Sequence, residues 1–416
     1  MLPTYDTPKQ RFTKNRAVLF VTAFTIMASG SFTTLAGLLT ATLVTKFGWS
    51  TSEIGIGVSI NMLLYGLTAP FAIQAMKKYG VRTVTTCALL LMIIGNLLIL
   101  SQNILVFNLS WGLLVGLGTG SLTMAYGAYV ARNWFPIEKQ GLVAGILTAS
   151  AVVGQFALLP FWASILVLYG WHAPLLGSSL IALVAIVLNL MIFPKHAGEL
   201  PTWASTGKPR NQVFEATRVL LAVIKSRAFW VLAIIFMICG ATTNGLLWSH
   251  FILACSDAGI SSVKASSVLF LVGIFNVAGT VFSGWLTDRI SPRLILASVF
   301  LARAATLLWL PLIIISDFDA KMLIFGILFG ILDVATVPPV ITLCNKVFGD
   351  SGPSVFAWIN AFHQLGAGAM ALSGGIIRTT MGDYQFMWLT AALLSVIAVA
   401  VSYSDRFEKL QAQTLT

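Results

Sequence analysis

The sequence predicts an all-α polytopic membrane protein with 12 transmembrane helices in two six-helix bundles. Of its 416 residues, 57% are hydrophobic and 9% are charged, whereas about 25% are charged in soluble domains. Apolar segments long enough to span a hydrocarbon core of about 30 Å recur along the chain. Two pairs of short polar segments also repeat at nearly equal distances. Together these observations exclude a soluble fold and favour a duplicated bundle.

The repeats set the architecture. The segment that begins at Arg132 returns at Asn345, 213 residues later, and segment 77–82 returns as 288–293, at an offset of 211. In both pairs a charged connector lies between long apolar runs. Two offsets this similar predict two homologous halves in the same orientation, as in transporters built from parallel repeats.

In chain order, the apolar runs give six spans, a polar stretch and six further spans. The polar stretch 194–228 is rich in proline and basic residues, so we interpret it as a cytoplasmic linker between bundles 1–193 and 229–416. Within it, 212–227 has the spacing of a linker helix or, as the alternative, of an interfacial amphipathic helix. The predicted spans are 17–42, 53–76, 83–101, 104–131, 141–168, 173–193, 229–254, 265–286, 294–316, 321–345, 354–377 and 384–403.

Small residues and prolines mark particular spans. Glycines recur in the fourth and eleventh spans, where small side chains let neighbouring helices approach closely. Pro160 interrupts the fifth span, and Pro338 and Pro339 interrupt the tenth. A proline frees backbone carbonyls that neighbouring groups or water must satisfy. We therefore expect bent helices beside a cavity at these prolines.

The charge of +11 is interpreted as a signal of topology. With the connectors assigned alternately to the two sides, 20 of the 25 basic residues fall on one side and four on the other. This bias places both termini in the cytoplasm, in a multi-pass protein of the cell inner (plasma) membrane. We do not expect a nucleic-acid partner. The expected partners are the lipid bilayer and a small-molecule substrate, with protons as a candidate coupling ion, and the protein is expected to be a monomer.

Several functional classes lack support. The four cysteines have no ligand-like spacing, so neither a disulfide framework nor a metal site is expected. No phosphate-binding loop is present, which argues against ATP as the energy source. We expect a protein that is not an enzyme and carries no cofactor.

The connector after the eighth span carries Gly284, Asp288, Arg289 and Arg293. A carboxylate at a helix end can accept bonds from backbone N–H groups and a neighbouring arginine, which would stabilise one of two bundle arrangements. We therefore predict a gating role for Asp288, Arg289 and Arg293. The alternative is that these charges only cap helices and hold the topology. In the first half Lys77 occupies the acidic position, and there the alternative is preferred.

This connector resembles the Gly-x-x-x-Asp-Arg-x-Gly-Arg-Arg motif of the major facilitator superfamily. Segments 47–50 (Phe-Gly-Trp-Ser), 134–136 (Trp-Phe-Pro) and 335–339 (Ala-Thr-Val-Pro-Pro) resemble the bacterial monocarboxylate-porter and oxalate–formate-antiporter-like group. The resemblance implies a secondary transporter that works by alternating access. It also implies uptake, for instance by symport, of a monocarboxylate-like or related organic metabolite.

Two ionisable residues lie deep in predicted spans, Arg303 in the ninth and Asp333 in the tenth. Charge in a membrane costs about 2.5–3.5 kcal/mol on insertion scales, so such residues are candidates for function. Both reach roughly mid-depth on consecutive antiparallel helices. We expect an intramembrane ion pair. The alternative makes Asp333 a substrate contact or proton carrier whose pKa Arg303 adjusts.

The eighth span departs from the group's pattern. Carboxylate-handling members have an arginine directly after a glycine, where this chain has Thr280 after Gly279. A hydroxyl cannot form a bidentate charged clamp on a carboxylate. The remaining candidates are aromatic or neutral hydrogen-bonding groups, which suit a planar, polar, uncharged solute. The predicted substrate-binding residues are Asn244, Trp248, His250, Asn276, Thr280, Asp333, Trp358, Asn360, His363 and Gln364.

Three further functions stay open beside monocarboxylate uptake. The first is uptake of a neutral heteroaromatic nutrient, with riboflavin transport as the model. The second is efflux of a small drug-like compound, although the fifth span lacks the Gly-Pro-rich pattern of drug–proton antiporters. The third is a membrane sensor on the same scaffold, which would need a sizeable soluble extension, and both tails are short.

Overall fold

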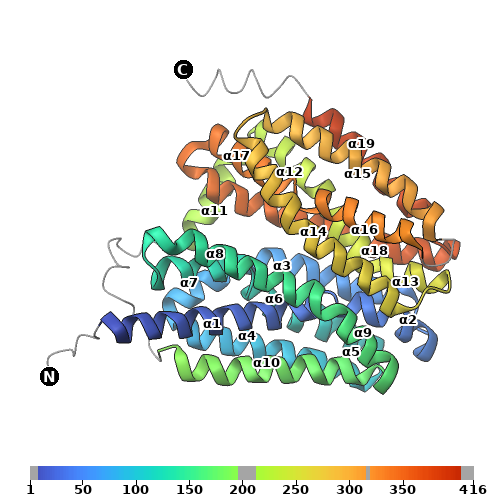
Figure 1. The fold of residues 1–416 in the computed structure, drawn as a ribbon, viewed down its shortest axis with the longest axis horizontal. Coiled ribbons are helices and arrows are strands. Elements are labelled where there is room, and N and C mark those ends of the chain that lie inside the picture. Colours follow the sequence, from blue (N-terminus) through green and yellow to red (C-terminus); the bar gives the residue numbers. More distant parts are fainter. Residues whose placement is uncertain (1–7, 195–211, 315–318, 404–416) are drawn as a thin grey trace.

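The computed structural model describes residues 8–194, 212–314 and 319–403, and within these ranges the chain is helical with short connections. Figure 1 shows α1 to α10 in the lower part of the molecule and α11 to α19 in the upper part. The predicted all-α membrane fold is confirmed. The domain boundaries stay predictions, and residues 195–211 of the predicted linker lie outside the described residues.

The lower part contains the first six predicted spans. Several are built from two or three helical segments joined end to end, because π-helical turns at Ser110–Val115 and Val153–Ala157 interrupt the regular hydrogen bonding. Its helices are α1 (Pro8–Thr33), α2 (Leu35–Phe47), α3 (Thr51–Tyr79), α4 (Val81–Leu97), α5 (Ile104–Leu109), α6 (Gly116–Ser121), α7 (Met124–Trp134), α8 (Ile137–Val152), α9 (Leu158–Tyr169) and α10 (His172–Ile192).

The upper part begins with α11, which lies within the predicted helical stretch 212–227. A further π-helical segment, Ala241–Trp248, joins α12 to α13. Its helices are α11 (Gln212–Val223), α12 (Arg227–Gly240), α13 (Ser249–Asp257), α14 (Ser262–Thr287), α15 (Pro292–Ile314), α16 (Ala320–Asp333), α17 (Val337–Phe348), α18 (Gly352–Met381) and α19 (Gln385–Ser402).

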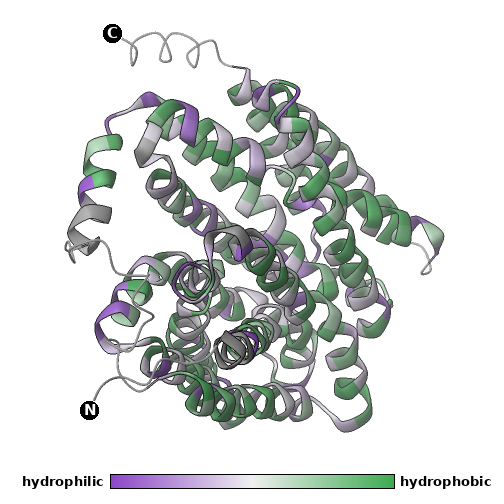
Figure 2. Cartoon of the chain, turned by 60° about the vertical axis from the view of Figure 1, so that its left-hand side comes forward, coloured by the Kyte–Doolittle hydropathy of each residue, from purple (hydrophilic) through white to green (hydrophobic). Residues whose placement is uncertain are grey.

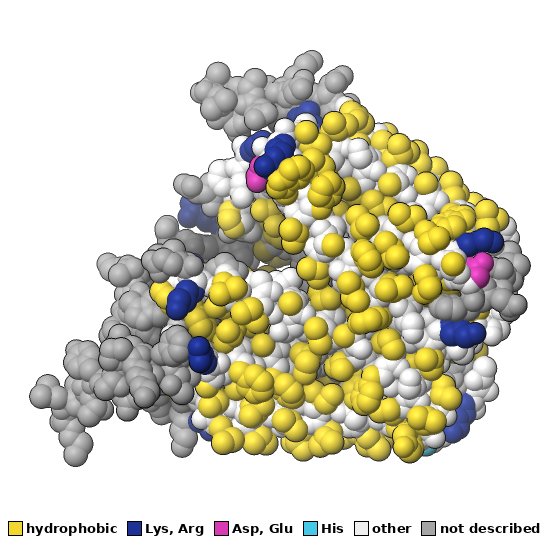
Figure 3. Space-filling view, viewed as in Figure 1, with side chains coloured by type: hydrophobic (Ala, Val, Ile, Leu, Met, Phe, Trp, Pro, Cys, Tyr) yellow, Lys and Arg dark blue, Asp and Glu magenta, His cyan; other side chains and the backbone are white. Residues whose placement is uncertain are grey.

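In the described part of the chain, 11 continuous helical stretches are long and apolar enough to cross a membrane. The predicted eleventh span is α18, which has 30 residues but is less apolar, because it carries Asn360, His363 and Gln364. Hydrophobic residues dominate the helices and cover much of the surface in view (Figures 2 and 3). Large side chains such as Leu168 and Met191 are more than 70% exposed, as expected where lipid replaces water.

Local sequence explains several helix ends. Ser50 begins α3 with a capping box: its hydroxyl accepts from the Glu53 backbone N–H at 3.2 Å, and its own N–H donates to the Glu53 carboxylate at 2.8 Å. Asn103 and Asp319 cap α5 and α16 because their side chains accept hydrogen bonds from backbone N–H groups of the first turn, without a reciprocal bond. These side chains satisfy N–H groups that a helix start leaves unbonded.

Candidate functional site

A cavity of about 1190 Å³ lies between the lower and upper parts of the molecule. From the lower part its walls come mainly from α3, and from the upper part mainly from α18, with further residues from α11, Ala241–Trp248 and α17. Its lining extends to Thr217 and Arg218 of α11 and to Pro353 at the start of α18. In Figure 3 the surface is hollowed between the two parts on the side where α1 begins. The cavity is therefore open towards that side.

The lining is polar but almost uncharged. Among the described lining residues only Arg218 carries a formal charge, and it lies on α11 at the mouth. The amide nitrogens of Gln155, Asn244, Asn360 and Gln364 donate no hydrogen bond to any described residue. Unbonded amides on a cavity wall are available to a solute that offers acceptors. The other lining residues with polar side-chain groups include Thr33, Asn61, Tyr65, Gln74, Trp111, Thr123, Trp248, Ser249 and Trp358.

Trp248 lies where the two parts meet. Its ring packs edge-on against Phe156 of the lower part, with centroids 5.2 Å apart. Its backbone carbonyl approaches Gly37 so closely that a side chain there would overlap it. The indole N–H is buried and finds no acceptor among the described residues. Because a buried, unpaired donor is costly, this N–H is a candidate to bind a solute acceptor.

The π-helical turn positions Asn244 and Trp248 on the cavity. In this turn Ser249 Oγ donates to the carbonyl oxygen of Asn244 at 3.1 Å, five residues back. Such widened turns occur mostly as single interruptions of α-helices and frequently at functional sites. Both residues line the cavity.

Five of the predicted substrate-binding residues line the cavity, and five do not. The lining set is Asn244, Trp248, Trp358, Asn360 and Gln364. The residues outside the lining are His250, Asn276, Thr280, Asp333 and His363. For this second group, contact with a solute in the cavity would need a different conformation.

Two of these five are hydrogen-bonded to neighbours in the upper part, and a third packs its ring against one. His250 lies between the carbonyl oxygen of Ala371, 2.9 Å from Nε2, and the Tyr384 hydroxyl, 3.0 Å from Nδ1. Thr280 donates to the backbone oxygen of Asn276, one turn earlier in α14, at 2.8 Å. His363 packs its ring on Phe236 at 4.8 Å.

Asp333 and Arg303 are brought together, although not through the carboxylate. Arg303 Nη2 donates to the carbonyl oxygens of Leu332 at 2.6 Å and Asp333 at 2.8 Å. Asn276 donates to one carboxylate oxygen of Asp333 at 2.9 Å, and the other is buried without a partner among the described residues. Between these two described side chains no nitrogen–oxygen distance falls within the 4.0 Å of a salt bridge.

The helix break explains this arrangement. α16 ends at Asp333, and Pro338 and Pro339 follow just after α17 begins. A proline has no N–H, so carbonyls one turn earlier lose their helical partner. Ser283 Oγ donates to the carbonyl oxygen of Ala335, while Arg303 donates to the two carbonyl oxygens at the end of α16. The buried guanidinium therefore acts as a cap for a helix end inside the membrane.

The predicted gating residues lie in the connector after α14 and at the start of α15. Arg289 Nη1 donates to the carbonyl oxygen of Trp285 at 2.9 Å, and its guanidinium lies 4.0 Å from that ring's centroid. The exposed Asp288 carboxylate makes no hydrogen bond or ion pair with a described residue. Arg293 is half-buried and does interact with other groups. A latch through Asp288 is therefore not formed in this arrangement.

Sequence reasoning missed the polar residues of the lower part that face the cavity. Asn61 and Tyr65 stand one turn apart on α3, a spacing that would have indicated a polar stripe within the second span. Asn61 Nδ2 donates to the carbonyl oxygen of Trp111 at 2.8 Å. Gln155 of the fifth span also lines the cavity.

Comparisons with known proteins agree on one family. A model described as the Major Facilitator Superfamily matches residues 19–371 and 256–412. The uncharacterized MFS-type transporter YcxA of Bacillus subtilis is 26% identical over 85% of this chain and 83% of its own. Monocarboxylate transporter 13 of Rattus norvegicus is 22% identical over 91% and 86%, and the sialic acid transporter NanX of Escherichia coli is 25% identical over 68% and 66%. The crystal structure of a D-xylose-proton symporter superposes with a TM-score of 0.71 over 93% of this chain and 97% of that one, at 15% identity.

Proposed function

Because the chain belongs to the major facilitator superfamily, whose members are transporters and not enzymes, we propose that it takes up a small organic solute with many hydrogen-bonding groups. The solute binds in the central cavity, and the two bundles move about it by alternating access. Under the predicted orientation, with both termini in the cytoplasm, the cavity is open to the cytoplasm.

The lining of the cavity carries this proposal. Its unbonded amides, the indole N–H of Trp248 and the hydroxyl of Tyr65 suit a polar solute. Among the described lining residues, none that carries a charge faces the middle of the cavity. A fixed carboxylate there would lose its hydration without gaining a cationic partner. The aromatic residues Trp111 and Trp358 add flat surfaces. A neutral, planar, polar compound, for which riboflavin is the model, meets these conditions.

A monocarboxylate is the second candidate, and the relatives favour it. Monocarboxylate and sialic acid transporters are among the proteins to which this chain is similar. Arg218 at the mouth could attract an anion, and a proton taken up with the solute would remove its charge. Efflux of a drug-like compound finds no specific support in the cavity.

Uptake into energised inside-out and right-side-out vesicles tests the proposal. Labelled riboflavin and lactate are compared with and without a protonophore, in vesicles with and without the protein. We expect saturable uptake of the neutral compound that fails in the variant Asn244→Ala/Gln364→Ala. Accumulation of lactate with no effect of that variant would support the carboxylate and overturn the neutral solute.

A further inference from the structure

We propose that the end of α18 remote from the cavity mouth is a gate, locked by the hydroxyls of Thr51 and Thr379. The lock joins the two parts of the molecule on the closed side and opens when the cavity changes its access. This inference rests on alternating access in the proposed function, but it does not depend on the identity of the solute.

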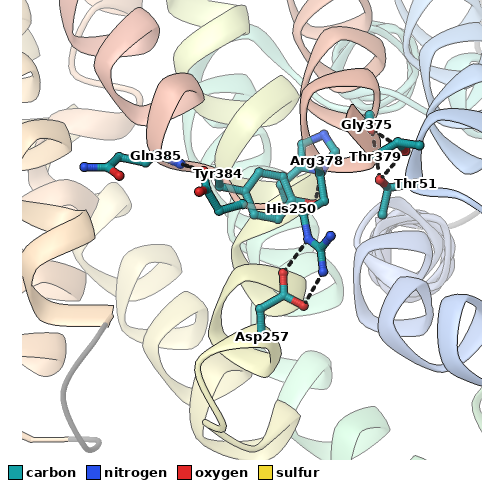
Figure 4. Close-up of polar contacts among 9 residues, drawn as sticks. Thr51, His250, Asp257, Gly375, Arg378, Thr379, Tyr384 and Gln385 are labelled. Carbon is teal, nitrogen blue, oxygen red and sulfur yellow. Dashed lines mark hydrogen bonds and ion pairs between the residues drawn. The ribbon is translucent and has the colours of Figure 1, made fainter. Parts of the chain in front are cut away.

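The hydrogen bonds across the seam carry the argument. Thr51, the first residue of α3, has its hydroxyl oxygen 2.9 Å from both the Gly375 carbonyl oxygen and Thr379 Oγ1 of α18. Thr379 Oγ1 is also 2.9 Å from that carbonyl and accepts from the Ser52 backbone N–H at 3.1 Å. Each hydroxyl has one hydrogen, so one hydroxyl can donate to the Gly375 carbonyl while the second hydroxyl donates to the oxygen of the first. Figure 4 shows Thr51 reaching this pair.

Close backbone contact makes these bonds possible. A Cβ at Gly375 would overlap the carbonyl group of Thr51. One turn further into the molecule, a Cβ at Gly55 would lie 3.1 Å from the carbonyl oxygen of Ala371. α3 and α18 therefore meet through main chain at this end.

Positions of α18 that adjoin the seam are fastened to its own part of the molecule. Arg378 pairs with Asp257 at the end of α13 through two bonds of 2.7 and 2.9 Å. The Ala371 carbonyl can only accept, so His250 Nε2 carries the hydrogen and Nδ1 accepts from the Tyr384 hydroxyl. The end of α18 thus moves with α13, and the seam contacts with α3 are those that break when the gate opens (Figure 4).

The experiment measures the distance across the closed side by pulsed electron spin resonance. Spin labels are placed at Lys46→Cys on α2 and Met381→Cys on α18, two exposed positions on different parts of the molecule. Cys87→Ser removes the exposed cysteine, since the other three are buried. Neither labelling site belongs to the cavity or the seam, and no solute is required.

We expect Thr51→Val and Thr379→Val each to raise the ratio of long to short distances about fivefold, the effect of one typical hydrogen bond. Thr51→Ser keeps the hydroxyl and should restore the short distance. Gly375→Ala, which wedges the seam, should make the long distance the major one. Thr380→Val is the matched control, because that exposed hydroxyl donates to Ile376 of its own helix at 3.0 Å.

The gate is refuted if Thr51→Val and Thr379→Val both give the distribution of Thr380→Val. It is also refuted if Gly375→Ala keeps the short distance in a correctly folded protein. Failure of every solute to be transported, combined with the expected shifts, would reject the proposed solute and leave the gate standing.

Discussion

Replacing Arg303 by methionine distinguishes a buried ion pair from a cap on a helix end. Arg303 Nη2 donates to the carbonyl oxygens of Leu332 and Asp333, and Nη1 donates to Cys239 Sγ and Thr242 Oγ1, both at 3.2 Å. Methionine has nearly the same length but no donor. The variant therefore removes these bonds with little change in packing.

The size of the effect follows from the bonds to the carbonyls. A hydrogen bond from a charged donor contributes about 1.5–3 kcal/mol, so loss of the two carbonyl bonds costs about 3–6 kcal/mol in the free energy of unfolding. The second variant, Asp333→Asn, keeps the backbone carbonyl and removes the carboxylate charge. If Arg303 acts on the carbonyls, the double variant Arg303→Met/Asp333→Asn stays as unstable as Arg303→Met within about 1 kcal/mol.

Reversible unfolding in lipid bicelles, followed by steric trapping, supplies the free energies. Arg289→Met serves as the control, because this arginine is exposed in the connector after α14 and, among the described residues, its side chain interacts with Trp285 at the end of that helix. Its loss should cost no more than about 1 kcal/mol. A double variant that regains wild-type stability would show that charge compensation dominates, and would refute the cap.

Two further predictions concern packing and coupling. Gly279→Ala should destabilise the protein by about 1–3 kcal/mol, because the new methyl group would overlap the Ile331 carbonyl of the neighbouring helix. Gly145→Ala is the control and should be neutral, because Gly145 has open space around it. Equal unfolding free energies of the two variants in bicelles would contradict this prediction. If Asp333 carries the coupled proton, Asp333→Asn should abolish solute accumulation driven by a pH gradient, which for one proton is about tenfold per pH unit, but should retain solute exchange at equal pH. Replacement of the exposed Asp383 by asparagine is the control. Unchanged accumulation in Asp333→Asn would exclude that role.

The sequence predicted the fold well because the membrane imposes simple rules. The length of the apolar runs predicted the spans, and 11 of them are helical stretches long and apolar enough to cross a membrane in the described part of the chain, while α18 is long enough but less apolar. The bend in the tenth span was predicted from Pro338 and Pro339, because a missing N–H acts locally. The π-helical segments, such as Ala241–Trp248, were not predicted, since nothing in the local pattern separates them from an α-helix.

The candidate site was only half predictable. Asn244 and Asn360 were found because a polar side chain in a span must face the protein interior. That rule does not distinguish a cavity wall from a packed interface, so His250 and Thr280 were included although their neighbours bind them. Asn61 and Tyr65 were missed because an uncharged polar pair one turn apart does not show by itself whether it faces a cavity or a packed helix.

By itself, the sequence determined that this is a bundle of membrane helices with a nearly uncharged interior, because apolar length and charge placement are properties of single segments. The tertiary structure decided what each polar group does. Arg303 binds backbone carbonyls instead of the Asp333 carboxylate, and Thr51 bonds Gly375 from the other part of the molecule, 324 residues away in sequence. Such contacts depend on how helices cross, and no local pattern of residues records that geometry.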